Sequence, residues 1–174
     1  MKKSLRFKKL RDIDPELLSE HAKYIAGLFD GDGAYVICLT RGKRVRFRPH
    51  ISLSMTHEET IKFVADKFGV SYARGKPRKN RKIMYYLRVF RAEDLVTILE
   101  ALARWSITKR QQVLTLLDFL ERTPIGQRIE KEALLEQAEM YLKLKELNIR
   151  GKRPPNFKEW AKQLIEEIKS YDDQ

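Results

Sequence analysis

Hydrophobic and polar residues alternate along residues 45–56, which is the pattern of a β-strand with one buried side and one solvent-facing side. Another strand-like segment, residues 34–41, precedes it, and Gly42 and Lys43 form a turn between the two. We therefore predict an antiparallel hairpin that buries one face. The polar face of its second strand carries Arg46, Arg48, His50, Ser52 and Ser54.

A second hairpin is predicted from residues 71–78 and 81–90, which Lys79 and Asn80 join. One face of each strand is again basic and holds no acid, whereas a surface that serves only solubility normally mixes both signs of charge. The sheet should therefore have one face in the core and one face suited to a polyanion. The basic faces consist of Tyr72, Arg74, Lys76 and Arg78 on one strand and Lys82, Met84, Tyr86 and Arg88 on the other.

Helical spacing of apolar residues predicts the remaining elements. The first helix begins at Asp14 and Pro15, an N-cap followed by proline, and runs to about Phe29. Thr56 is a candidate N-cap for the next helix, and Gly69 ends it. Further helices are expected at residues 92–103, 108–120 and 129–147, and in a last segment with Trp160, Leu164 and Ile168. The order is helix, hairpin, helix, hairpin, helix and further helices, which predicts an α+β fold.

The length of 174 residues is enough for one domain with its own core. We expect a basic N-terminal arm over residues 1–13 and a single domain over residues 14–174, with a C-terminal helical extension over about 128–174. The net charge of +12 is high for this length and points to nucleic acid as the partner.

Cys38 is the only cysteine, so an intrachain disulfide is excluded and a reduced compartment is expected. The chain has neither a long apolar run nor a secretory signal. We therefore expect an intracellular protein, in the cytoplasm or in an organelle with access to genomic DNA, that is not secreted. Neither a membrane nor a small-molecule cofactor is expected as a partner.

The segment Y-I-A-G-L-F-D-G-D-G, residues 24–33, carries the candidate chemistry. Asp30 and Asp32 stand at the carboxyl end of a helix, where the helix dipole disfavours carboxylates, so they need a counter-charge. A divalent metal held by carboxylate and backbone oxygens would supply it. An EF-hand loop is excluded, because Ala34 stands where a further acid is needed and Arg41 where the closing glutamate is needed.

This segment resembles the LAGLIDADG motif of homing endonucleases, with Ile25 in the first position, Phe29 in the fifth and Gly31 in the seventh. The resemblance implies an αββαββα-like core with C-terminal helices and an antiparallel saddle that lies in the major groove of double-stranded DNA. It also implies phosphodiester hydrolysis with Mg²⁺, for which Ca²⁺ can substitute as a non-catalytic ion in a trapped complex. One motif in a chain of this length implies a homodimer that cuts a long, near-palindromic site.

The small residues Ala22, Ala26 and Gly27 have helical spacing and are expected where the two LAGLIDADG helices of the dimer approach most closely. Asp32 matches the metal-binding acid of the family, and the carbonyl group of Gly31 matches its backbone ligand. Asp30 matches the acid that caps and packs the helix ends.

Two further catalytic positions follow from the resemblance. His57 takes the place of a polar residue just past the second strand, although Glu58 and Glu59 are alternatives. Lys109 is the candidate for the basic residue at the start of a later helix. In the strictest register Thr108 takes that place, so the basic group is either Lys109 or Arg110.

The expected DNA contacts divide into two classes. Strand residues reach base edges, whereas a basic loop after the fifth helix contacts the DNA backbone. The strand and turn residues are Arg41, Lys43, Arg44, Arg46, Arg48, His50, Ser52, Ser54, Tyr72, Arg74, Lys76, Arg78, Lys82, Tyr86 and Arg88, and the loop residues are Arg150, Lys152 and Arg153.

Two other functions are compatible with this scaffold. One is an RNA-binding intron-splicing maturase, and the other is a DNA-binding protein without catalysis. The intact D-G-D-G segment favours cleavage, because a protein that only binds nucleic acid does not need carboxylates placed against a helix dipole.

Overall fold

The computed structural model describes residues 13–77, 79–123, 129–149 and 156–171. The described residues form six helices and a four-stranded antiparallel sheet. The elements, in order, are α1 (Pro15–Asp32), β1 (Gly33–Thr40), β2 (Arg46–Met55), α2 (Glu58–Lys67), β3 (Tyr72–Arg74), β4 (Tyr85–Val89), α3 (Ala92–Ala103), α4 (Arg110–Arg122), α5 (Lys131–Leu147) and α6 (Phe157–Lys169). The predicted α+β fold class is confirmed.

Helix α1 begins as its sequence predicts and ends later. The Asp14 carboxylate accepts hydrogen bonds from the backbone amides of Glu16 and Leu17, at 3.0 and 3.2 Å, and Pro15 follows the cap. The helix continues through both motif acids to Asp32, three residues beyond the predicted end. Gly33 then starts β1 directly, and a methyl group there would lie 2.4 Å from Cδ1 of Phe29. Glycine is therefore required for the chain to turn this tightly beneath the Phe29 ring.

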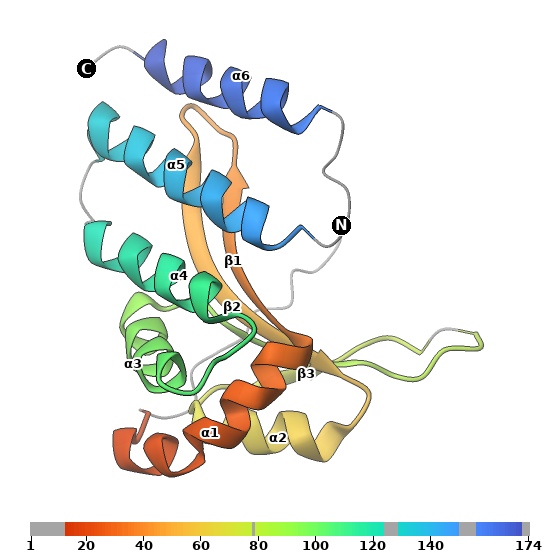
Figure 1. The fold of residues 1–174 in the computed structure, drawn as a ribbon. Helices are drawn as coiled ribbons and strands as arrows, with labels where there is room; N and C mark the ends of the chain where they lie inside the picture. Colours follow the sequence, from red (N-terminus) through yellow and green to blue (C-terminus); the bar gives the residue numbers. More distant parts are fainter. Residues whose placement is uncertain (1–12, 78, 124–128, 150–155, 172–174) are drawn as a thin grey trace.

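The strands of the sheet lie in the order β1-β2-β4-β3, and all the pairs are antiparallel. The β1–β2 hairpin pairs continuously from Gly33 opposite Leu53 to Thr40 opposite Arg46, as predicted. Figure 1 shows helices α3 to α6 stacked beside this curved hairpin, with α1 and α2 beneath it. More buried and more exposed residues alternate along most of β1 and β2, so the described helices cover one face of the sheet and leave the other face open.

The second hairpin is paired over a shorter length than predicted. Strand β3 covers only Tyr72–Arg74 and β4 only Tyr85–Val89. Beyond them, Gly75 N donates to the carbonyl oxygen of Met84 at 2.7 Å, and the rest of the hairpin projects from the body as an arm (Figure 1). Pro77 lies in this arm, and a proline cannot donate a ladder hydrogen bond.

The core lies between the helices and the covered face of the sheet. Phe29 of α1 lies against Tyr35 of β1 and Phe68 after α2, with ring centroids 5.8 and 6.0 Å apart. Leu164 and Ile168 of α6 belong to the same buried cluster. The C-terminal helices thus add to one continuous core. The expected N-terminal arm lies almost entirely outside the described residues, and the domain limits stay a prediction.

Helix α2 has a different N-cap from the predicted one. His57, not Thr56, caps it, because Nδ1 of the His57 ring accepts a hydrogen bond from the backbone amide of Thr60 at 3.4 Å. The predicted end is correct, since Gly69 has a φ of 58° and so takes the left-handed conformation that stops a helix.

Candidate nucleic-acid interface and metal site

The end of α1 and the start of α4 are tied together by two reciprocal sets of hydrogen bonds. The Asp30 carboxylate accepts from the backbone amides of Ile107, Thr108 and Lys109, at 2.7, 3.1 and 3.1 Å. These amides precede α4, so the carboxylate satisfies donors at the start of that helix. Asp30 therefore has a structural role in this chain.

The other set comes from Lys109, whose side chain is buried with 8% of its surface exposed. Its ammonium group donates to the carbonyl oxygens of Phe29, Gly31 and Gly33, at 2.9, 3.1 and 2.7 Å. This cation supplies the counter-charge that the carboxyl end of α1 requires. The amine contacts the backbone of the motif, whereas Thr108 and Arg110, on either side of it in the sequence, are exposed.

Asp32 is exposed, and its carboxylate has no hydrogen bond or ion pair to any described residue. Among the described residues no group of three or more His, Cys, Asp or Glu side chains is arranged to hold a metal. One chain thus presents one carboxylate and the Gly31 carbonyl group, which already accepts a hydrogen bond from Lys109. Mg²⁺ requires six oxygen ligands and often takes only one or two carboxylates among them. One chain therefore supplies part of a donor set that fits a divalent metal, and the remaining oxygen ligands must come from outside the described residues.

The outer face of α1 differs from the predicted dimer face. Ala22 and Ala26 are buried in this chain's own core, so their assignment to the interface is wrong. Gly27 and Gly31 are exposed, and a Cβ atom at either position would have no neighbour within 4 Å. The reason is helical phase: Ala22 and Ala26 share the face of Leu18, Ile25 and Phe29, whereas both glycines lie opposite. Gly27, the third predicted interface residue, is on the free face.

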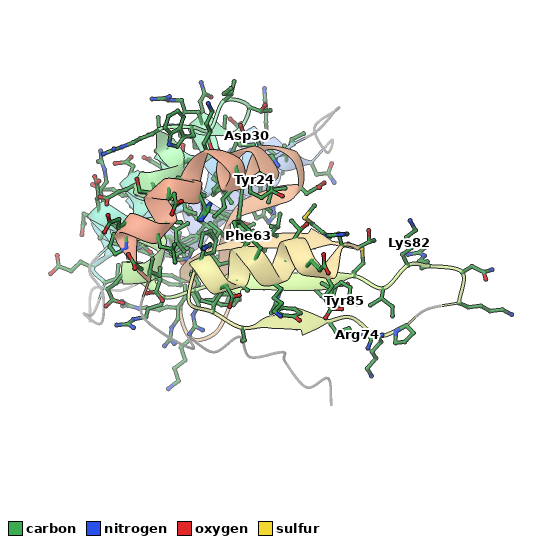
Figure 2. All side chains as sticks on the ribbon, turned by 90° about the horizontal axis from the view of Figure 1, so that it is seen from below. Tyr24, Asp30, Phe63, Arg74, Lys82 and Tyr85 are labelled. Atoms are coloured by element: carbon green, nitrogen blue, oxygen red, sulfur yellow. The ribbon has the colours of Figure 1, made fainter. Side chains whose placement is uncertain are left out.

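Large apolar side chains are exposed on α1 and on the segment that precedes α4. Tyr24 is 54% exposed and lies edge-on to Phe63 of α2, with ring centroids 5.7 Å apart (Figure 2). In the segment before α4, Trp105 is 46% and Ile107 87% exposed, and the Lys23 amine of α1 lies 5.4 Å from the Trp105 ring. The signal for this surface in the sequence is Tyr24, a large aromatic residue on α1 outside the buried face of this helix.

The open face of the sheet holds most of the predicted strand residues. Paired residues on neighbouring antiparallel strands share a face, and Ser52 pairs with Arg88, Ser54 with Tyr86, Cys38 with Arg48 and Thr40 with Arg46. Cys38 and Thr40 were missed as candidates, although alternation from the buried Tyr35 and Ile37 already assigns them to this face.

The predicted face of β3 is wrong. Tyr72 pairs with the buried Leu87 and Arg74 with the buried Tyr85, so both side chains lie on the helix side of the sheet. The Tyr72 hydroxyl donates to a Glu58 carboxylate oxygen at 3.0 Å. Hydrogen bonds from Tyr85 and Tyr72, with the charge of Arg74 nearby, lower the pKa of Glu58 below its usual value. Alternation within so short a strand could not establish its phase.

His50 lies on the open face but is largely covered. Its ring centroid is 5.1 Å from that of Phe90, and its Nδ1 atom is 3.7 Å from the Cys38 sulfur. Burial, together with the positive charge of Arg88, lowers the pKa of His50 to about 4. The imidazole is therefore neutral at neutral pH and is not a phosphate-binding cation.

His57 follows β2 at the edge where β1 begins, because Gly33 pairs with Leu53. Besides capping α2, its Nδ1 atom lies 2.9 Å from the Thr60 hydroxyl oxygen. The topology thus brings His57 and Asp32 to the same end of the sheet. The catalytic role expected for His57 stays a prediction.

Comparison with known families gives an independent result. Residues 19–103 match the family described as LAGLIDADG-like domain. These residues form a LAGLIDADG-like domain. A comparison with curated proteins found no match.

Solved structures extend the similarity beyond the LAGLIDADG-like domain. The homing endonuclease I-CvuI, in complex with its target in the presence of Ca, is similar over 88% of this chain and 98% of its own, with a TM-score of 0.68 and 18% identity. The archaeal intron-encoded homing endonuclease I-Vdi141I, complexed with DNA, is similar over 86% and 97%, with a TM-score of 0.67 and 16% identity. The fold is therefore that of the LAGLIDADG homing endonucleases.

A third similarity differs in coverage. This chain covers 51% of the meganuclease I-SmaMI bound to uncleaveable DNA, with a TM-score of 0.60 and 12% identity. This chain thus spans nearly all of I-CvuI and I-Vdi141I but about half of I-SmaMI.

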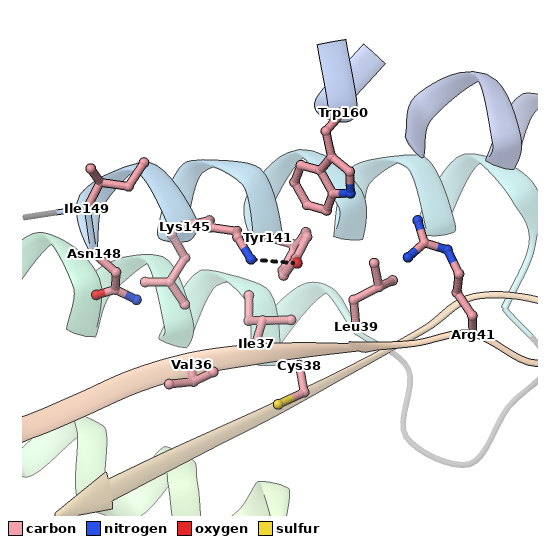
Figure 3. A pocket seen from close by; sticks show the side chains of 11 residues that line it. Val36, Ile37, Cys38, Leu39, Arg41, Tyr141, Lys145, Asn148, Ile149 and Trp160 are labelled. Atoms are coloured by element: carbon pink, nitrogen blue, oxygen red, sulfur yellow. Dashed lines mark hydrogen bonds between the residues drawn. The ribbon is translucent and has the colours of Figure 1, made fainter. Parts of the chain in front are cut away.

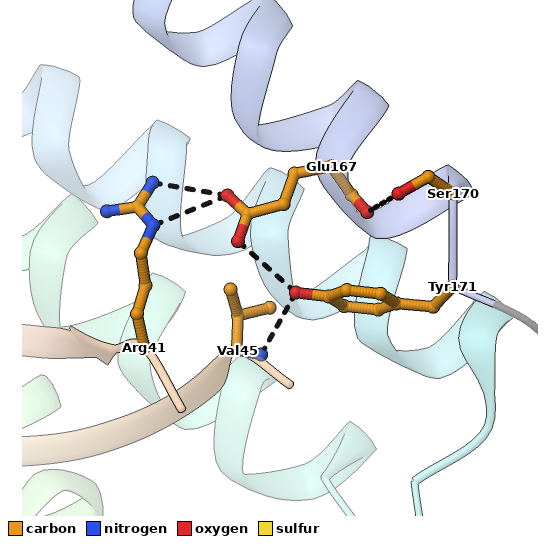
Figure 4. A network of polar contacts seen from close by, with 5 residues as sticks. All are labelled: Arg41, Val45, Glu167, Ser170 and Tyr171. Carbon is orange, nitrogen blue, oxygen red and sulfur yellow. Dashed lines mark hydrogen bonds and ion pairs between the residues drawn. The ribbon is translucent and has the colours of Figure 1, made fainter. Parts of the chain in front are cut away.

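The turn after β1 of the LAGLIDADG-like domain is attached to α6. The Arg41 guanidinium donates through Nε and Nη2 to one Glu167 carboxylate oxygen, both at 3.3 Å, and the other oxygen accepts from the Tyr171 hydroxyl at 3.2 Å (Figure 4). Arg44 lies over the Tyr171 ring, 5.8 Å from its centroid. Arg41 therefore already contacts α6 and Arg44 contacts Tyr171 just after it, whereas Lys43 is exposed.

Lys76 and Lys82 are exposed on the arm of the second hairpin. Figure 2 shows Lys82 on this arm, away from the body of the protein. The remaining predicted contacts, Arg78, Arg150, Lys152 and Arg153, lie outside the described residues.

A groove of about 630 Å³ runs between the free edge of β1 and helices α5 and α6 (Figure 3). Within it the Lys145 amine donates to the Tyr141 hydroxyl at 3.3 Å and lies 5.1 Å from the Trp160 ring centroid.

None of the described helices is long and apolar enough to cross a membrane.

Proposed function

We propose that this chain is a site-specific double-strand DNA endonuclease that acts as a symmetric homodimer and requires a divalent metal. The observation that carries the proposal is the exposed Asp32 at the end of a helix whose outer face is free and small at Gly27 and Gly31. A two-fold axis beside these glycines brings two α1 helices together and places two Asp32 carboxylates near each other. The single-chain donor set is then completed.

The dimer is also supported by the exposed Tyr24, Trp105 and Ile107. Tyr24 lies on α1 itself, and the segment with Trp105 and Ile107 contacts α1 at Lys23 and Asp30. Large exposed apolar side chains on and beside a helix whose backbone can be closely approached favour a protein partner. The coverage of the similar structures agrees, since one such chain corresponds to about half of I-SmaMI.

DNA is supported as substrate by the open sheet face. Arg46, Arg48 and Arg88 are exposed there, and arginine pairs bidentately with guanine in the major groove. I-CvuI and I-Vdi141I were solved with DNA, and I-CvuI with Ca or Mg present. Their use of DNA favours the same class of substrate here, and a two-fold dimer favours a near-palindromic target of the kind an intron-encoded enzyme recognises. Such an enzyme acts in a compartment that holds genomic DNA.

The residues have distinct roles in this mechanism. The sheet face binds and orients the duplex, and the paired α1 helices place the Asp32 carboxylates beside the scissile phosphates. A Mg²⁺ ion held by Asp32, with Gly31 as the candidate backbone ligand, would supply charge stabilisation and a more acidic water. We assign to His57, which lies at the same end of the sheet, the role of a polar group that would help to orient water there. The target is recognised by base contacts on the sheet and by phosphate contacts of the surrounding lysines and arginines.

The test begins with a randomised duplex library bound in Ca²⁺. Selected DNA is then incubated with Mg²⁺, and we expect a discrete cut in both strands at one position. Asp32→Asn protein should select the same DNA and leave it intact. If the protein selects a duplex but does not cut it with any divalent metal, it is a non-catalytic DNA-binding protein. Preferential binding of structured RNA would indicate a maturase.

A further inference from the structure

One buried amine holds the backbone on both sides of Asp32. The ammonium group of Lys109 has three N–H donors, and the three carbonyl oxygens of Phe29, Gly31 and Gly33 accept from it within 3.1 Å. Gly31 and Gly33 are the immediate neighbours of Asp32 in the sequence. The orientation of the Asp32 backbone is therefore determined by where the amine stands.

The position of the amine is itself fixed. The Lys109 backbone amide donates to Asp30 at 3.1 Å, so this residue is attached to the motif through both its main chain and its side chain. The carboxyl end of α1 carries the negative end of the helix dipole, which favours a cation at this place. If the Lys109 amine moved out to bind a phosphate in solvent, the three carbonyl oxygens would lose their hydrogen-bond donor, which costs free energy for buried acceptors.

We infer that Lys109 is a positioning residue that holds Asp32 in its metal-binding geometry, and that the basic side chain which reaches the phosphate is that of Arg110. Arg110 is the first residue of α4 and is exposed. This inference rests on the proposed function of Asp32. It resolves the choice between Lys109 and Arg110 that the sequence leaves open.

The test compares full-length Lys109→Met and Arg110→Met with Lys143→Met, a control at an exposed position of α5. Hydrogen exchange of the amides in residues 30–33, Ca²⁺ affinity, thermal midpoint and single-turnover cleavage against pH are measured for each. Lys109→Met should speed exchange at residues 30–33 and weaken Ca²⁺ binding about 10–100-fold, the usual effect of removing a group that supports a metal ligand. Its residual cleavage should keep the wild-type pH profile.

Arg110→Met should leave exchange, Ca²⁺ affinity and melting as in the wild type while cleavage falls about 100–1,000-fold, the range for loss of one group that stabilises charge in the transition state. Lys109→Arg keeps a buried cation with several donors, so it should recover most of the Ca²⁺ affinity. It also serves as the deciding variant if Lys109→Met does not fold.

The inference is overturned if Lys109→Met, or Lys109→Arg in its place, has wild-type exchange and Ca²⁺ affinity but loses cleavage together with one limb of the pH profile. That result would mean that the amine acts on the reacting groups directly. Hydrogen exchange tests the positioning even if the wild-type protein cuts no DNA, so failure of the proposed function and failure of this inference are distinguishable.

Discussion

The Gly27→Leu substitution should block dimerisation while the single chain keeps its fold. Gly27 is exposed on α1, and a Cβ atom there would meet nothing within 4 Å. The chain's own packing therefore accommodates a longer side chain. In an exposed helix interior leucine is about 0.8 kcal/mol more favourable than glycine, which for a domain of this size corresponds to a rise in thermal midpoint of about 2–3 °C.

The same substitution should destabilise the dimer. If the two α1 helices approach each other at Gly27 and Gly31, four extra carbon atoms on each chain must separate them, and the Asp32 pair moves apart with them. A wild-type dimer gains about 2.7 kcal/mol of stability when the subunit concentration is 100-fold above its dissociation constant, so its thermal midpoint rises with concentration. The Gly27→Leu midpoint should not depend on concentration.

The assay is sedimentation together with melting at several concentrations and cleavage of the selected DNA. We expect Gly27→Leu to sediment as a monomer, to melt independently of concentration and to make no double-strand cut. Glu139→Leu, which adds an exposed leucine to α5, should behave like the wild type. A Gly27→Leu protein that remains a dimer and still cuts both strands would refute the placement of the interface on this face of α1.

Three further predictions concern the site and the sheet. Asp32→Asn should fold and bind DNA like the wild type but lose Mg²⁺-dependent cleavage, and cleavage at a near wild-type rate would reject Asp32 as a metal ligand. Arg48→Ala should cost about 1–3 kcal/mol at particular base pairs, whereas Arg74→Ala should leave base preference unchanged because its side chain lies on the helix side; a library of single-base target variants measures both. The folded-state pKa of His50 is about 4, below the value near 6.5 of an unfolded histidine, so the unfolded chain takes up the proton first. Stability should therefore fall by up to about 3 kcal/mol as the pH drops from 6.5 to 4, and urea unfolding of His50→Gln across this range should show a flatter dependence.

Elements that depend on local pattern could be predicted from the amino-acid sequence. Alternation over the whole of β2 assigned its two faces correctly, because the long strand repeats the pattern several times. The cap at Asp14 and the left-handed Gly69 marked helix ends through backbone chemistry that needs no distant partner. The motif likewise identified Asp30 and Asp32 as the acids of the candidate site.

Tertiary structure decided where local pattern was too short or ambiguous. The phase of β3 is set by its pairing with β4, and three paired residues carry too little alternation to predict it. Small residues occur on both sides of α1. Only the packing of the folded chain shows that Ala22 and Ala26 are buried in its own core while Gly27 is exposed.

The role of Lys109 is the clearest case. Its partners Phe29, Gly31 and Gly33 are 76–80 residues away in the sequence, and all of them are backbone carbonyl groups. Every amino acid carries a backbone carbonyl group, so the residue types at these positions do not indicate which carbonyl groups accept a hydrogen bond. No sequence pattern could therefore show that the Lys109 amine binds the motif. Only the contact between the residues just before α4 and the end of α1 decides it, because the folded chain brings a buried cation to the negative end of a helix dipole.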